Sequence, residues 1–303
     1  MQIRYNSFNS FLKRKFPGYK VRKIPINAGF SCPNKNGEIS DEGCIFCDNY
    51  GSGPIKTFTQ SIRQQIEMFT SANKGKKFIA YYQAHSNTYA SPEELEEKYN
   101  IIFEYNDIVG LFIGTRPDSI EVDVYPVLEK ISKKTYLSIE LGLQSIHEKS
   151  LDLLNRNHSY EVFLETFEKL RSSGIDVIVH LIIGIPGETK KDMQKTIQEM
   201  NRIKPAGVKF HLLHVLKDTK LFDMYENGEI KLMEKNEYIK AIVDLIGELD
   251  KDIVVHRLTG DRDIEIFHAP EWALDSKRVI SAIQKKMDDL DLNQGQKSRI
   301  DSR

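Results

Sequence analysis

Apolar residues recur along this chain with two alternating periods, one typical of strands and the other typical of helices. Short runs rich in β-branched and aromatic residues predict six strands, at residues 19–26, 77–84, 108–114, 136–143, 177–183 and 208–215. The run at 177–183 is almost continuously apolar, as expected for a parallel strand that is covered on both faces. Between the strands, residues 122–130, 160–172 and 192–203 repeat their apolar positions at helical spacing and predict helices.

Strands that alternate with helices predict βαβ units and therefore a parallel sheet. Six of them predict an α/β fold, a partial (β/α)6 barrel of the TIM type, over residues 1–220. Two further helical stretches predict a C-terminal helical extension at 221–290 that packs on the barrel, and the polar residues 291–303 predict a disordered tail. In such barrels the loops after the strands carry the functional site.

Composition and charge change this picture little. The chain is 40% hydrophobic and 29% charged, which is ordinary for a globular protein. Because no apolar run could span a bilayer and residues 1–8 do not resemble a secretory signal, we expect a cytoplasmic protein without a membrane partner. The net charge is only −1, yet residues 1–23 carry seven basic residues and no acidic one. This segment is either a solvated basic stretch or a phosphate-contacting edge.

All three cysteines of the chain lie in one 16-residue window directly after the first predicted strand. Cys32, Cys44 and Cys47 have the spacing Cys-x11-Cys-x2-Cys. An odd number of cysteines argues against a disulfide framework and for a metal site or reactive thiols. Thiolates suit iron–sulfur clusters, zinc or Cu(I). From the spacing alone, a zinc site completed by a histidine such as His85 remains open.

The sequence around these cysteines resembles the cluster loop of radical S-adenosylmethionine (SAM) enzymes of the YtqA/YhcC type, in the branch of the Elongator catalytic subunit. The matching stretches are GFSCPN at 29–34, GCIFC at 43–47, QAHSNTY at 83–89, GTRPD at 114–118, ELGLQ at 140–144, HLIIGIPGE at 180–188, KFHLLH at 209–214 and RLTGD at 257–261. The resemblance covers nearly all of residues 5–290. It implies one [4Fe-4S] cluster held by Cys32, Cys44 and Cys47, whose open iron binds SAM, and an external one-electron donor such as flavodoxin or ferredoxin.

The resemblance also implies which loops contact SAM. Gln83, Asn87 and Thr88 follow the second predicted strand, where related folds approach the methionine amino group. The plain alternative is that these side chains only satisfy the loop backbone. Gln144 and Arg156 resemble a pair that contacts SAM in oxygen-independent coproporphyrinogen oxidases. A guanidinium suits the methionine carboxylate because its hydrogen bonds are charge-assisted, although Arg156 could also be a surface charge.

Further cofactor contacts are implied on the fourth, fifth and sixth predicted strands. Glu140 belongs to the matching stretch of the fourth strand. His180 is expected inside the barrel, and Ile183, or Ile185, is expected against the adenine ring. On the sixth strand, His211 and His214 lie three residues apart, so we expect at most one of them to face the cavity.

The YtqA-type resemblance implies tRNA as the partner. The implied step converts 5-carboxymethylaminomethyl-(2-thio)uridine at the wobble position to the aminomethyl form, and a CH2 between an amine and a carboxylate stabilises a carbon radical. Lys13, Arg14, Lys15 and Arg257 are the predicted tRNA contacts. Because Lys13–Lys15 precede the first strand, we expect them near the cysteine loop. Two alternatives stay open: a radical SAM enzyme acting on a tetrapyrrole-like small molecule, and a zinc-stabilised RNA-binding protein without catalysis.

Overall fold

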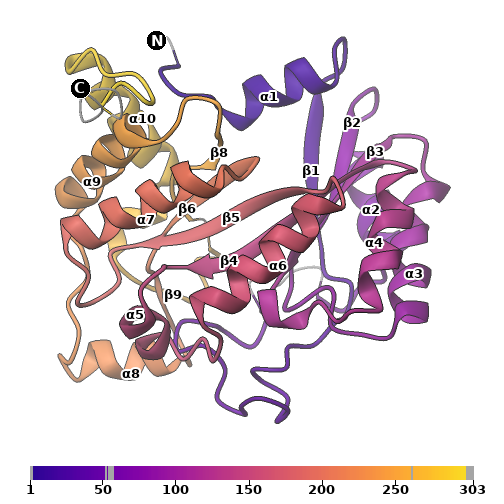
Figure 1. Cartoon of the computed structure of the whole chain (residues 1–303), viewed down its shortest axis with the longest axis horizontal. Coiled ribbons are helices and arrows are strands. Elements are labelled where there is room, and N and C mark those ends of the chain that lie inside the picture. The colour runs from indigo at the N-terminus through magenta and orange to yellow at the C-terminus, as the bar shows by residue number, and fades with distance from the viewer. Residues whose placement is uncertain (1–2, 52, 54–57, 261, 298–303) are drawn as a thin grey trace.

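The fold is built around a curved parallel sheet (Figure 1). The computed structural model describes residues 3–51, 53, 58–260 and 262–297. The sheet has seven strands in the order β1-β2-β3-β4-β5-β6-β8, and each strand pairs in parallel with the next. Their bounds are Val21–Ile26 (β1), Lys77–Tyr82 (β2), Ile108–Thr115 (β3), Tyr136–Gln144 (β4), Asp176–Ile183 (β5), Gly207–Leu212 (β6) and Val254–Arg257 (β8).

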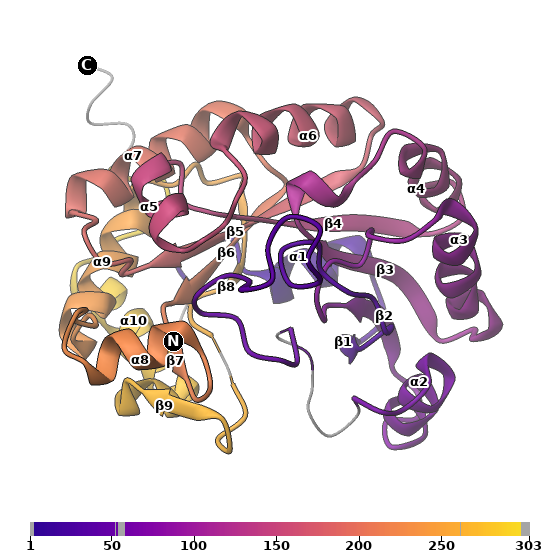
Figure 2. The ribbon, with the colours of Figure 1, turned by 90° about the horizontal axis from the view of Figure 1, so that it is seen from below.

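Helices line the outer side of this sheet in an arc (Figure 2). They are α2 (Ile62–Ser71), α3 (Pro92–Asn100), α4 (Val124–Ser132), α6 (Tyr160–Ser172), α7 (Lys190–Ile203) and α9 (Lys235–Glu248), with α10 (Ser276–Asp289) packed on α9. Short elements complete the fold: α1 (Phe8–Lys15), α5 (Glu148–Leu153), α8 (Lys220–Glu226) and the antiparallel pair β7 (Val215–Leu216) and β9 (Phe267–Ala269). Among the described residues, no helix has both the length and the apolar character needed to cross a membrane.

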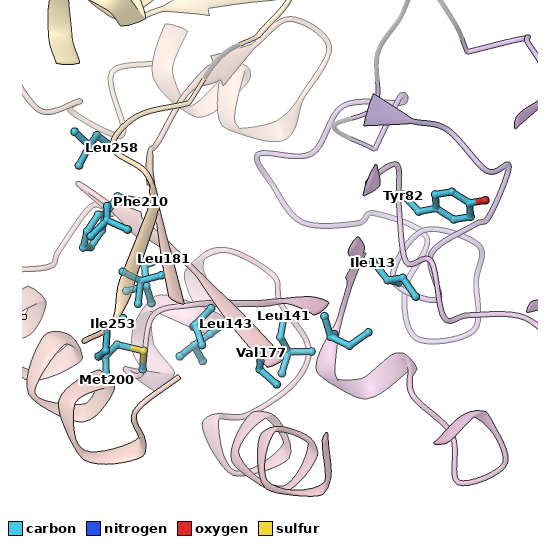
Figure 3. Packing of buried hydrophobic residues seen from close by; sticks show 14 of the residues in the cluster. Tyr82, Ile113, Leu141, Leu143, Val177, Leu181, Met200, Phe210, Ile253 and Leu258 are labelled. Carbon is cyan, nitrogen blue, oxygen red and sulfur yellow. The ribbon is translucent and has the colours of Figure 1, made fainter. Parts of the chain in front are cut away.

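Alternate residues of each strand face the helices or the inside of the barrel. On β2, Phe78 and Tyr82 pack outward into the largest hydrophobic core, whereas Ile79 and Tyr81 pack inward. Figure 3 shows part of the outward core, in which Met200 of α7 lies near the sheet. Each large apolar side chain buried in this way contributes about 1.5–3 kcal/mol. The outward core therefore holds the sheet to the helices and leaves the inward face for polar groups.

Helix α1 closes one end of the barrel. Its Leu12 belongs to the inward cluster with Ile79 and Phe112, and its Phe11 ring lies 6.0 Å from the ring of Tyr136, the first residue of β4. The N-terminal ends of the strands therefore lie under α1, and Figure 1 shows the loop after β1 at the opposite end of the sheet. The barrel interior is open at the C-terminal ends of its strands.

Three sequence expectations need correction here. The sheet has a seventh strand, β8, formed by residues 254–257 of the predicted extension, so the expected number of six strands was too small, while the division at residue 220 stays a prediction. The run 208–215 is not one strand, because β6 ends at Leu212 and Val215 pairs with β9 instead. The basic residues Lys13–Lys15 are exposed on α1, so their expected place near the cysteine loop is wrong: the whole length of β1 separates the two.

The predicted disordered tail is also wrong for its first part. Gln294 is only 8% exposed, and its side-chain Nε2 donates to the carbonyl oxygens of Asp250 (2.7 Å) and Ile253 (2.8 Å). Its Oε1 accepts from the backbone N–H of Asn6 at 2.8 Å. These bonds order residues 291–297, because an amide with all its partners inside the protein is costly to release. Residues 298–303 lie outside the described part of the chain.

Candidate functional site

Cys32, Cys44 and Cys47 line a single cavity at the open end of the barrel. This cysteine cavity measures about 830 Å³, counted to its open mouth. Its walls also include residues from the inward faces of β2, β4 and β6, namely Tyr81, Glu140 and Lys209. The structure therefore brings the cysteines to the C-terminal ends of the strands, where barrels of this type carry their function.

Three asparagines fix the cysteine loop to the segment after α5. The side chain of Asn155 donates to the carbonyl oxygen of Gly43 at 2.6 Å, and Asn34 donates back to the carbonyl oxygen of Asn155 at 2.8 Å. Asn157 donates to Oδ1 of Asn34 at 2.7 Å. Asn155 and Asn157 have φ values of 52° and 54°, in the left-handed region that asparagine tolerates better than most residues. This clamp places Arg156 against the loop.

Arg156 contacts the sulfur of Cys44. Its Nη1 lies 3.2 Å from Cys44 Sγ, and its Nη2 donates to the carbonyl oxygen of Gly142 (2.7 Å) and to Nε2 of His158 (3.0 Å). Only 5% of the residue is exposed, and its Nε is buried without a partner in the described part of the chain. The surface-charge interpretation of Arg156 is therefore wrong. This guanidinium faces the cysteines and still has a donor to offer.

Two further donors approach the same sulfur. Arg116 places Nη1 at 3.8 Å from Cys44 Sγ while it binds Asp118 through Nε (2.8 Å) and Nη2 (2.6 Å). The side-chain nitrogen of Asn34 lies 3.5 Å from the sulfur. Donors from three residues therefore converge on the Cys44 sulfur.

The donor set of this cavity fits an iron–sulfur cluster. Cys32, Cys44 and Cys47 would hold it through soft thiolate ligands, and three ligands leave one iron of a four-iron cluster open. As a free thiol, Cys47 has its pKa raised to about 12 by burial and by the neighbouring Cys44, so metal binding would displace a proton. Within the described residues, no three His, Cys, Asp or Glu side chains converge as around a single metal ion.

A buried carboxylate lies below the cysteines. Glu140 on β4 is 1% exposed and accepts hydrogen bonds from Lys23 of β1, from Lys209 of β6 at 2.5 Å and from His180 of β5 at 2.8 Å. Burial alone would raise the pKa of Glu140, but the charges of Lys209 and Lys23 hold it well below its usual range. Lys209 also donates to the hydroxyl oxygen of Tyr81 at 3.1 Å.

Burial also changes the bases in this network. It lowers the pKa of Lys209 to about 7, although the charge of Glu140 opposes the shift. It lowers the pKa of His180 to about 4, together with the charge of Lys209. At neutral pH, Glu140 is thus ionised and His180 is neutral, and Lys209 is the base that titrates nearest to neutrality. The network can hold or move a proton at the Lys209 Nζ and the Tyr81 hydroxyl.

Of the predicted cofactor contacts, some line the cysteine cavity and others do not. Those that do are Gln83, Glu140, Gln144, Arg156 and His180, and the predicted tRNA contact Arg257 lines it as well. Gln144 ends β4 with a φ of 77°, a strained value for a residue other than glycine.

Asn87 and Thr88 are not brought to the cavity. The amide nitrogen of Asn87 donates to the carbonyl oxygens of Ala84 (2.9 Å) and Gly114 (2.8 Å). The hydroxyl of Thr88 lies 2.6 Å from that of Thr115. Both residues tie the loop after β2 to β3, as the plain alternative expected. Their predicted role as cofactor contacts is corrected accordingly.

The predicted adenine contact, Ile183, points the wrong way. It packs in the outward core, whereas Ile182, on the same face of β5 as His180, lines a chamber that adjoins the cysteine cavity. Alternate residues of a strand share a face, so a strand that turns His180 inward must turn Ile182 inward and Ile183 outward. Ile185, the other possibility, lies beyond the end of β5 and packs with Ile182 in a smaller apolar cluster.

Several cavity residues were missed by sequence reasoning. Lys209 and Arg116 line the cysteine cavity, as does Ser86, whose buried hydroxyl has no partner in the described part of the chain. For Lys209 a signal existed, because every second residue of a strand faces the same side. For Ser86 and Arg116, which lie on loops, no periodic pattern was available.

Comparison with known proteins identifies the family. The model of the radical SAM superfamily matches residues 37–200, and that of the radical SAM C-terminal domain matches residues 205–289. YtqA of Bacillus subtilis is 36% identical over 297 residues, covering 96% of this chain and 92% of YtqA. YhcC of Escherichia coli is 31% identical over 274 residues, covering 90% of this chain and 88% of YhcC.

Two more distant proteins extend the comparison. A tRNA uridine(34) acetyltransferase of Methanocaldococcus jannaschii is 34% identical over 157 residues, half of this chain and 28% of that protein. The structure of archaeal Elp3 from Methanocaldococcus infernus superposes with a TM-score of 0.66 at 21% identity. That match covers 91% of this chain and 64% of Elp3, and it shows the shared fold. With its cysteine-lined half-barrel and these matches, the chain belongs to the radical SAM superfamily, in the branch of YtqA and YhcC.

Proposed function

We propose that this radical SAM enzyme modifies the wobble uridine of tRNA, converting the 5-carboxymethylaminomethyl side chain, with or without 2-thiolation, to the 5-aminomethyl form. The observation that carries the proposal is the similarity, over half of the chain, to an enzyme named for acting on uridine 34 of tRNA. An excess of cationic side chains around the cysteine cavity supports an anionic substrate.

The cofactor follows from the family. A [4Fe-4S] cluster with bound SAM supplies a 5′-deoxyadenosyl radical after one-electron reduction by an external donor such as flavodoxin or ferredoxin. We propose that Cys32, Cys44 and Cys47 hold the cluster. In the same proposal, Arg156 binds the methionine carboxylate through its unpaired Nε, and Gln83 and Gln144 orient SAM from the cavity wall.

The residues below the cysteines have their own part in this proposal. Lys209 and Tyr81 face the cavity and share a hydrogen bond, and Glu140 holds Lys209 in place. We propose that this pair exchanges protons with the substrate amine while the apolar floor of the barrel, closed by Leu12 of α1, excludes water. In this proposal the charged and polar residues of the cavity bind SAM, orient the substrate and exchange protons with its amine.

The nucleosides of cellular tRNA provide the test. We expect that deleting the gene makes the 5-carboxymethylaminomethyl nucleosides accumulate and the aminomethyl-derived nucleosides fall, as measured by mass spectrometry of digested tRNA. Complementation with the natural gene should restore the parental profile. Complementation with a Cys47→Ala gene should not restore it. An unchanged profile in the deletion strain would reject the tRNA assignment and favour a small-molecule substrate.

A prediction on metal content separates the cluster from zinc. Anaerobically reconstituted protein is expected to be brown and to hold about four irons per chain. Cys32→Ala, Cys44→Ala and Cys47→Ala should each lose the colour and abolish SAM cleavage, because three thiolates are needed to leave one iron open. Ser31→Ala, next to Cys32 and exposed, is the matched control and should retain the iron. One tightly bound zinc per chain, with the variants unaffected, would overturn the cluster.

A further inference from the structure

A second chamber adjoins the cysteine cavity. This side chamber measures about 540 Å³, counted to its open mouth, and shares with the cysteine cavity the residues Phe46, Gln144, His180, His211 and Arg262. It extends away from the cysteines toward Leu216 and Gly260, which belong to the C-terminal third of the chain. A ligand in the side chamber would therefore lie directly beside the cysteine cavity.

Two histidines give the side chamber unpaired polar groups. The Nε2 atoms of His211 and His214 are buried and have no hydrogen-bond partner in the described part of the chain. His214 is 8% exposed, and its ring packs edge-on against Phe267. Burial and the charge of Arg262 lower the pKa of His214 to about 3, so at neutral pH it is an uncharged donor or acceptor. Buried imidazoles without partners are costly, and a ligand that pairs with them removes that cost.

Gly260 makes room for one of these rings. A Cβ at position 260 would lie 2.6 Å from Cε1 and 3.2 Å from Nδ1 of His214. Any side chain there would therefore push the imidazole out of its place. Gly260 lies in the sequence between Arg257 and Arg262, the two arginines of the cysteine cavity wall. This short stretch of chain thus supplies both two cations of the wall and the space for the His214 ring.

The charged residues in the walls of the cysteine cavity and of the side chamber indicate what kind of ligand the side chamber binds. Six charged residues line the cysteine cavity in the described part of the chain, five cations and one carboxylate: Arg116, Arg156, Lys209, Arg257, Arg262 and Glu140. Among the described residues that line the side chamber, Arg262 is the charged one, and the others are histidines, Gln144, Gly260 and apolar groups. The carboxylate of Asp48, outside this lining, also acts on the Arg262 charge, so a ligand would share the five guanidinium N–H donors with the protein. A guanidinium beside apolar walls and neutral imidazoles favours a flat group that bears one negative charge.

We propose that the side chamber is the substrate pocket, that Arg262 recognises a carboxylate carried by the substrate, and that Gly260 positions His214 to hydrogen-bond the flat ring. The choice of a uracil ring rests on the proposed function, whereas the carboxylate rests on the chamber alone. The C-terminal third of the chain then sets specificity, in addition to completing the sheet through β8.

Equilibrium binding to the reconstituted, SAM-saturated enzyme tests this proposal. The probes are 5-carboxymethyluridine and its neutral isostere 5-carbamoylmethyluridine, with uridine 5′-monophosphate as a phosphate-bearing comparison. We expect the carboxylate to bind at least about tenfold more tightly than the amide, the range for a charge-assisted hydrogen bond. Arg262→Gln should remove this preference. Arg278→Gln, an exposed arginine on α10, is the matched control and should keep it.

The histidine is tested by a pair of variants. Gly260→Ala and His214→Ala should each weaken the binding of both uridines severalfold, and the double variant should be no worse than either single one. His214→Asn should recover part of the loss. Iron content should remain, which separates a lost pocket from a lost fold. Additive losses in the double variant would overturn the positioning role of Gly260.

The remaining outcomes are decisive as well. If the natural enzyme binds no carboxylate probe, shows no preference over the amide, or keeps that preference after Arg262→Gln, the carboxylate assignment falls. Equal binding of uridine 5′-monophosphate and 5-carboxymethyluridine, lost together in Arg262→Gln, would make the recognised group a phosphate instead. A carboxylate preference that depends on Arg262, found alongside an unchanged tRNA nucleoside profile, would uphold the pocket and reject the tRNA function.

Discussion

At the scale of single residues, Arg156 joins the cysteines to the cavity. If its guanidinium binds the methionine carboxylate, Arg156→Ala should weaken SAM binding by about 1.5–3 kcal/mol, the range for a hydrogen bond to a charged group. Calorimetry on the reconstituted protein measures this loss. Arg202→Ala, on the exposed side of α7, should bind SAM normally. An unchanged affinity of Arg156→Ala for SAM would show that Arg156 contacts Cys44 but does not bind SAM.

His158 links the same arginine to the stability of the fold. Burial, together with the charge of Arg156, lowers the pKa of His158 to about 3, against an ordinary value of 6.5. Between these values the unfolded chain binds a proton that the folded chain does not, so stability is lost as the pH falls below 6.5. We expect His158→Gln to flatten the pH dependence of the unfolding free energy by about 1.4 kcal/mol per pH unit in that window.

Urea denaturation at several pH values between 6.5 and 4 measures this slope. His158→Gln keeps an oxygen that accepts from Arg156, so the hydrogen bond itself need not be lost. The same slope in the variant and the parent would show that His158 is protonated inside the folded protein.

At the scale of elements, the sequence predicted most of the sheet because strand and helix periods differ clearly. The predicted strands at 136–143 and 177–183 agree closely with β4 and β5. The same alternation predicts which residues share a face, yet Ile183 was assigned to the inside together with His180, which strand geometry forbids. The seventh strand, β8, was missed because four residues give no period to read.

The limits of sequence reasoning are clearest in the loops. The cysteines and Arg156 were found through motifs whose spacing reflects their chemistry. Ser86 and Arg116 line the cavity because of their loop conformations, and nothing in the residue pattern encodes those conformations. The expected place of Lys13, Arg14 and Lys15 near the cysteine loop was wrong for a related reason, and their contact with tRNA stays a prediction. These residues are close to the cysteines along the chain, but the strand β1 separates the two in space.

The position of α1 leads to a prediction about its charges in tRNA binding. Lys13, Arg14 and Lys15 lie at the closed end of the barrel, so replacing all three by glutamine should change tRNA affinity less than about twofold. Lys35 is the comparison, because its Nζ donates to the carbonyl oxygen of Asp48 beside Cys47. Lys35→Gln should reduce the salt slope of log K by about 0.9, the value for one phosphate contact.

Filter binding of tRNA at several salt concentrations distinguishes the two variants. The triple variant removes more charge than Lys35→Gln, so net charge alone would predict the opposite order. A larger loss in the triple variant would place the tRNA across the closed end of the barrel and would separate its binding surface from the cysteine cavity.

At the scale of the whole molecule, Gln294 joins the two ends of the described chain. Its backbone N–H donates to the carbonyl oxygen of Arg4 at 2.9 Å, and its side chain bonds to the segment around Asp250. Gln294→Ala keeps the backbone bond but leaves the carbonyls of Asp250 and Ile253 and the N–H of Asn6 without the side-chain partner, so it should lower the unfolding free energy by about 1–3 kcal/mol. Gln296→Ala, two residues on and exposed, should change it little. Thermal or urea unfolding measures the stability of the two variants. If Gln294→Ala is as stable as Gln296→Ala, residues 291–297 do not stabilise the fold through Gln294.

The pairing of Arg4 with Gln294 also determines how this enzyme can be handled. Both residues lie on the α1 and α10 side of the molecule, and Figure 1 shows the cysteine loop at the far side. A peptide linker or surface anchor attached near either residue would hold the protein by its closed end. An enzyme anchored to an electrode in this way would present its cavity mouth to the solution, open to a soluble electron carrier and to a macromolecular substrate alike.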